Sequence, residues 1–198
     1  MLLGAVCGYP VALLPLQMLL VNLVTDGLPA LALGLDPPSP EVMARRPRPP
    51  QESLFARGLG RLIVVRGVII GLATLAVFMI CLHDGGNLRQ ARTLAMCTLV
   101  LSQLLHAFDA RSQTAALWEQ NLLSNPALVA AVASSLVLLA AVMYVPALRA
   151  LFHLALPTVT GWSLVLLAAS AGAVLFGAGK AARAWWRRRF AIMRVRLR

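Results

Sequence analysis

The chain has 198 residues, of which 60% are hydrophobic and 13% are charged, and 18 Lys and Arg against 7 Asp and Glu give a net charge of +11. Soluble domains carry about 25% charged residues and disordered chains are more polar still, so this composition excludes both classes. The length also leaves no room for a large soluble catalytic domain beside several membrane spans of about 20 residues each. In so apolar a chain, the basic excess indicates loops beside an anionic membrane face, and we expect no nucleic-acid partner.

Five apolar segments have nearly the length that a membrane-spanning helix needs. They are continuous and rich in Leu and Ala rather than alternating, which favours helices over strands. A further apolar piece, Met1–Gly8, is too short to span. The sequence therefore predicts an all-α fold, a polytopic transmembrane helical bundle with five spanning helices plus a partial N-terminal one. The predicted spans are Leu16–Leu35, Leu62–Leu82, Thr93–Phe108, Ala127–Val145 and Trp162–Gly179.

The basic residues are distributed unequally between the two ends of these spans. Fourteen lie in the first long loop, the third loop and the tail, which share one side, and three lie on the other side. Arg66 lies a turn inside the second span, from which we expect it to snorkel to the basic side. The positive-inside rule then predicts a multi-pass protein of the inner or plasma membrane, surrounded by lipid, with a cytoplasmic C-terminus. We expect a membrane domain over residues 1–182 and a basic cytoplasmic tail over 183–198.

The same orientation places Met1 outside the cell. A start methionine followed by half of an apolar helix favours a chain whose first helix has lost its beginning. The alternative is that a short N-terminal segment simply crosses the membrane.

Asn22, Thr25 and Asp26 form a polar cluster inside the first apolar segment. Their spacing places an amide, a hydroxyl and a carboxylate on one face of a helix near the bilayer centre. Pro29 has no N–H for the carbonyl four residues back, so a backbone oxygen is freed beside them. Such an all-oxygen set suits a hard cation. The alternative is a structural hydrogen-bond cluster that packs against another helix.

The segment from Leu14 to Gly34, LPLQMLLVNLVTDGLPALALG, closely resembles the sixth transmembrane helix of the calcium- and sodium-pump class of P-type cation ATPases. Later segments resemble helices seven to ten of that family in order. The resemblance implies that Asn22, Thr25 and Asp26 coordinate the transported cation, with calcium as the expected ion. It also implies that Gln103, in the third span, occupies the place where two-site calcium pumps carry a Glu ligand. Because the Gln103 amide is neutral, it would bind a second cation more weakly than a Glu ligand does. We therefore expect one transported ion per cycle.

The chain contains neither a DKTG-type phosphorylation motif nor a P-loop, and we assign it no catalytic residue. ATP and Mg²⁺ would act only through the family's cytoplasmic domains. We therefore expect the partner to be the missing N-terminal part of the pump, which comprises helices one to five and those cytoplasmic domains. Gly67-x-x-x-Gly71 provides a face on which another helix can pack closely, and the resemblance implies that this helix is the fifth. Two alternatives remain: a stand-alone membrane protein, channel-like or regulatory, and a non-functional remnant of a pump gene. For His106, we favour a local pair with Asp109 over a role in the site.

Overall fold

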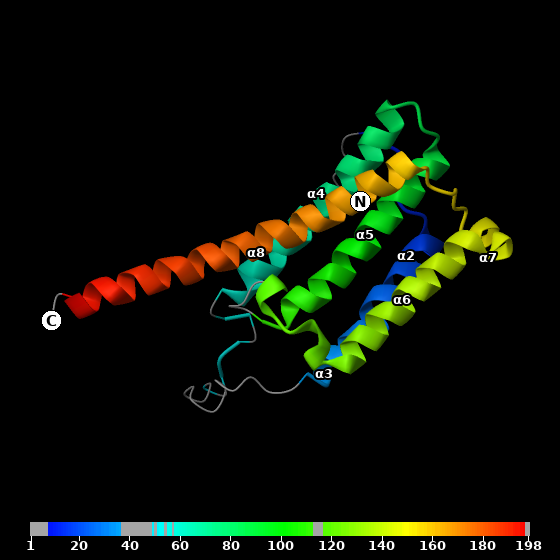
Figure 1. Cartoon of the computed structure of the whole chain (residues 1–198). Coiled ribbons are helices and arrows are strands. Elements are labelled where there is room, and N and C mark those ends of the chain that lie inside the picture. Colours follow the sequence, from blue (N-terminus) through cyan, green and yellow to red (C-terminus); the bar gives the residue numbers. More distant parts are fainter. Residues whose placement is uncertain are drawn as a thin grey trace.

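Each long apolar segment forms a helix in the computed structural model (Figure 1). The structure describes residues 8–36, 49, 51–53, 55–56, 58–112 and 117–196. The side chains of Asp26, Leu117, 183–185 and 187–196 are not part of this description. Apart from Gly8, the expected partial helix at Met1–Gly8 lies outside the described residues.

The first span is built from three consecutive pieces and the other four spans are continuous α-helices. In chain order the elements are α2 (Pro15–Asn22), the π-helical turn η1 (Leu23–Gly27), α3 (Leu28–Gly34), α4 (Leu59–His83), α5 (Leu88–Ala110), the 3₁₀ turns η2 (Leu117–Glu119) and η3 (Leu122–Ser124), α6 (Pro126–Tyr144), α7 (Pro146–Leu151) and α8 (Val159–Arg196). The described part of the chain has five helices long and apolar enough to cross a membrane. The chain is thus an all-α, multi-pass membrane protein, as predicted.

Helix α5 is the centre of the bundle. It packs against α4 and α8 on one side and touches the first span on another, while α3 packs against α6 (Figure 1). Although its mean hydropathy of 1.3 is the lowest of the five spans, 61% of it is buried, against 22% for α4 with a mean hydropathy of 2.5. The least apolar span is therefore the most buried of the five, whereas the most apolar one, α4, is among the least buried.

Three helices are longer than the sequence predicted, and α4 exceeds its predicted span Leu62–Leu82 at both ends. Helix α5 begins at Leu88, five residues earlier than expected, because Asn87 Oδ1 accepts from the Gln90 amide at 2.8 Å and Gln90 Oε1 accepts from the Asn87 amide. This reciprocal capping satisfies two amide groups that a helix end otherwise leaves unpaired. Helix α8 continues to Arg196, so the basic tail prolongs the last span as a helix.

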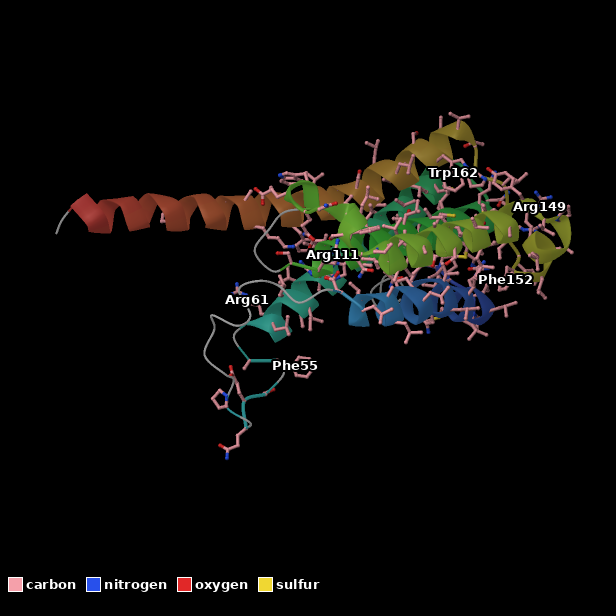
Figure 2. The ribbon with its side chains drawn as sticks, turned by 60° about the horizontal axis from the view of Figure 1, so that its bottom comes forward. Phe55, Arg61, Arg111, Arg149, Phe152 and Trp162 are labelled. Atoms are coloured by element: carbon pink, nitrogen blue, oxygen red, sulfur yellow. The ribbon has the colours of Figure 1, made fainter. Side chains whose placement is uncertain are left out.

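Hydrogen bonds fasten the connection between α7 and α8 at one end of the bundle. Figure 2 shows Arg61 and Arg111 toward one end, and Arg149, Phe152 and Trp162 toward the other. At the latter end, the fully buried Gln17 donates to the Phe152 carbonyl at 3.0 Å, and Thr93 Oγ1 accepts from the Ala155 amide at 2.9 Å. These bonds attach the segment between α7 and α8 to α2 and α5.

Candidate cation site

The first span is interrupted where the sequence predicted a break. The π-helical turn η1 separates α2 from α3, and Pro29 lies in the first turn of α3. A Cβ at Gly27 would meet no atom within 4 Å, so the turn is open on that side. A π turn contains one residue more than an α turn and frequently marks a functional site. The interruption thus falls on the segment that carries Thr25 and Asp26.

Thr25 and Gln103 line the same cavity, of about 560 Å³, between the first span, α4 and α5. Thr25 is buried, and its Oγ1 donates to the Val21 carbonyl at 2.8 Å. Gln103 Oε1 is buried and has no hydrogen-bond partner in the part of the chain that the structure describes. Buried polar atoms are normally paired, so this oxygen fits a ligand position.

The other two candidate residues are placed differently. The Asn22 side chain is exposed at the end of α2. The backbone of Asp26 belongs to η1, but its side chain is not among those that the structure describes. The single face predicted for Asn22 and Thr25 assumed α-helical spacing, and the wider π turn changes the angle between successive residues. The structure therefore brings together Thr25 and Gln103, and not Asn22.

The described donors around the cavity are too few to hold a hard cation alone. Calcium takes six to eight oxygen ligands. Across the described ranges, no group of three or more His, Cys, Asp or Glu side chains is placed to bind a metal ion. The neutral oxygens of Thr25 and Gln103 fit a contribution to a cage that further groups complete.

A buried cluster of charges lies beside the cavity. Arg66 from α4 and Lys180 from α8 both bond the carboxylate of Asp109 from α5, Lys180 Nζ at 2.6 Å. Lys180 Nζ also donates to the carbonyls of Asp109 and Ser112, and the Arg66 guanidinium lies 5.1 Å from the centre of the Phe176 ring. The cluster joins the three helices near the end of the bundle at which Arg111 lies.

Two interpretations of the sequence are wrong at this cluster. Arg66 does not snorkel, because it is 8% exposed and its guanidinium is paired inside the protein. Asp109 pairs with Arg66 and Lys180, and His106 lies instead near Arg66, with 3.4 Å between Nε2 and Nη1. No local sequence pattern indicates these pairs, since the partners are 43 and 71 residues apart.

A second polar network ties the end of α3 to the loop before α6. Arg111 bonds Asp36 Oδ1 at 2.9 Å and also reaches the Asn121 carbonyl and the Ser124 hydroxyl. Asn125 donates to Asp36 Oδ1 and to the Ala32 carbonyl, both at 3.0 Å, while it caps α6. The end of the broken span is therefore fixed to its neighbours by side chains that the sequence analysis did not single out.

A multi-pass helical bundle with an interrupted span beside a cavity that Thr25 and Gln103 line has a feature that recurs in transport membrane domains. Residues 10–182 match the family model described as Cation transporting ATPase, C-terminus. Because the match covers most of the chain, the chain belongs to this family and forms a C-terminal membrane region of the kind found in cation-transporting ATPases.

Individual relatives agree with the family match. The chain is 47% identical over 167 residues to a calcium-transporting ATPase of Bacillus subtilis (strain 168), a match that covers 84% of this chain and 19% of the relative. It is 34% identical over 181 residues to calcium-transporting ATPase 1 of Bacillus cereus (strain ATCC 10987 / NRS 248), covering 83% of this chain and 20% of the relative. A probable calcium-transporting ATPase of Trypanosoma brucei brucei is 37% identical over 171 residues, covering 74% and 17%. The chain thus spans about a fifth of the length of these relatives.

Proposed function

We propose that this chain is the C-terminal membrane domain of an ATP-driven calcium pump, in which Thr25, Asp26 and Gln103 supply oxygen ligands to the transported ion, whereas the exposed Asn22 is not placed with them. The observation that carries the proposal is the cavity shared by Thr25 and Gln103 beside the π turn, with Gln103 Oε1 buried and unpaired in the described part of the chain. Hydroxyl and amide oxygens suit a hard cation such as Ca²⁺. The relatives that match this chain are calcium-transporting ATPases by name.

The ligand charges determine how many ions the site holds. Of these three ligands, only Asp26 is acidic, and the amide at Gln103 adds no charge. A site with few charged ligands binds divalent cations weakly. A second Ca²⁺ would therefore lack charged ligands, and the set supports one Ca²⁺ per transport cycle.

ATP hydrolysis and the remaining cation ligands come from the rest of such a pump, with its other helices and its cytoplasmic domains using ATP and Mg²⁺. Gly67 and Gly71 support this partnership, because both lie exposed on α4 and a Cβ at either would meet no atom within 4 Å. A surface of small residues allows another helix to approach closely. The excess of Arg and Lys at one end of the bundle supports an inner or plasma membrane location with the C-terminus in the cytoplasm.

The test is ATP-dependent uptake of radioactive calcium by vesicles that contain the pump assembled with this chain. Asp26→Asn should abolish uptake, because it removes the acidic ligand at the site. Asp84→Asn is the matched control, since Asp84 lies in the exposed turn after α4 and should leave uptake unchanged. Uptake by Asp26→Asn at the unmodified rate would refute the assignment, and calcium flux through liposomes with this chain alone would favour a stand-alone channel.

A further inference from the structure

We infer that Ser135 of α6 is a positioning residue for the cation site: its hydroxyl holds the π turn of the first span in the shape that presents Thr25 and Asp26. This inference rests on the proposed function for its transport consequences. Its structural part concerns one hydrogen bond, from Ser135 Oγ to the carbonyl oxygen of Val24, with an oxygen–oxygen distance of 2.6 Å. Both residues are only 1% exposed.

The Val24 carbonyl needs a donor from outside its own helix. In a π-helical ladder a carbonyl pairs with the amide five residues further on, and for Val24 that residue is Pro29. Proline has no N–H to give. In a membrane interior without water, an unpaired carbonyl is strongly disfavoured, so the turn requires a substitute donor. Ser135 supplies one from the neighbouring helix, and Figure 1 shows α6 running alongside α2 and α3.

The direction of this hydroxyl is unusual among the described spans. Serine and threonine in membrane helices commonly donate to a carbonyl of their own helix, one turn back. Thr74, Thr98 and Ser134 all do so, donating to Ile70, Leu94 and Ala131. Ser135 instead crosses to an element 111 residues away in sequence.

This bond affects the residues that follow directly. Thr25 lines the cavity and belongs to the same turn as Val24, so the direction of the Val24 carbonyl fixes the peptide plane that leads into Thr25. Without the Ser135 hydroxyl, the turn must rearrange to find another donor for the carbonyl, and the ligand oxygens lose their preset positions. Ser135 itself is not a ligand, because its hydroxyl is directed at the backbone of the turn.

The transport test compares Ser135→Ala, Ser135→Thr and Ser134→Ala in the assembled pump. For Ser135→Ala we expect the calcium concentration at half-maximal uptake to rise about tenfold, the equivalent of one lost buried hydrogen bond, with the maximal rate within about twofold. Ser135→Thr keeps the hydroxyl and should restore the unmodified affinity. Ser134→Ala should change neither quantity, because that hydroxyl donates within its own helix, to the Ala131 carbonyl. An unchanged affinity in Ser135→Ala, or an equal loss in Ser134→Ala, would overturn the inference.

A second measurement on the chain itself separates this inference from the proposed function. Carbonyl-labelled valine with amide-labelled threonine marks two Val–Thr pairs in the chain, Val24–Thr25 and Val159–Thr160. In bilayers, Ser135→Ala should shift the Val24 carbonyl resonance toward that of an unbonded carbonyl and leave the Val159 resonance unmoved. A shift without any calcium uptake by the unmodified pump would refute the proposed function and retain the bond, whereas no shift would refute the bond.

Discussion

Asp109 offers the sharpest test of how the bundle is held together. Its carboxylate is 1% exposed and accepts from both Arg66 and Lys180, so Asp109→Asn leaves two buried cations facing a neutral amide. Removing one partner of a buried ion pair destabilises a protein by about 3–5 kcal/mol. Arg66→Met is milder, because the pair of Lys180 with Asp109 survives, and we expect a loss of about 1–3 kcal/mol.

The double variant distinguishes a charge effect from a packing effect. Adding Arg66→Met to Asp109→Asn removes one of the two buried cations that lose their shared carboxylate, so the double variant should be more stable than Asp109→Asn alone by about 1–2 kcal/mol. The assay is the free energy of unfolding of the purified chain in bicelles, measured by steric trapping. Asp84→Asn, an exposed carboxylate, should stay within about 0.5 kcal/mol of the unmodified chain. If Asp109→Asn proved no less stable than Arg66→Met, or if the two losses simply added, the reasoning would be refuted.

Four further predictions concern Arg111, Gly86 and Gly71. Arg111→Met removes the ion pair with Asp36 and the bonds to the loop before α6, and should lower the free energy of unfolding by about 1–3 kcal/mol in the same assay; an unchanged value would show that the network is dispensable. Gly86→Ala would place a Cβ 2.6 Å from the Cys81 carbonyl oxygen and should cost about 1–3 kcal/mol, whereas a neutral result would mean that the turn shifts freely. Gly71→Ala, which meets no atom within 4 Å, should instead stabilise the isolated chain by about 0.5–1 kcal/mol. Gly71→Leu should reduce co-purification with the rest of the pump without destabilising the chain, and normal co-purification would contradict a helix docking there.

The sequence predicted the features that depend on local pattern. Continuous apolar runs of about 20 residues determined the five spans, because a helix must cross the hydrocarbon layer with its own backbone bonds satisfied. Pro29 and Gly27 correctly located the break in the first span. The resemblance to the pump family supplied Gln103, which indeed lines a cavity with Thr25.

Contacts between distant residues were beyond such reasoning. Arg66 inside an apolar run is equally compatible with snorkelling and with a buried partner, and only the packing of α4 against α5 decides in favour of Asp109. Ser135 is one of two adjacent serines, and nothing in the sequence says which of them faces the first span. The π turn η1 adds one residue to a helical turn, which changes the residues that share a face of the helix. Asn22 and Thr25 therefore no longer lie on the same face.

Equilibrium binding of radioactive calcium to the assembled pump tests the central claim most directly, because it needs no turnover. The unmodified pump should bind one Ca²⁺ per molecule, with Thr25→Ala and Gln103→Ala weakening that binding and Asp26→Asn abolishing it, while Asp84→Asn binds normally. Unaltered calcium binding by Asp26→Asn together with Thr25→Ala and Gln103→Ala would contradict the assignment of the cation site to the first span and α5.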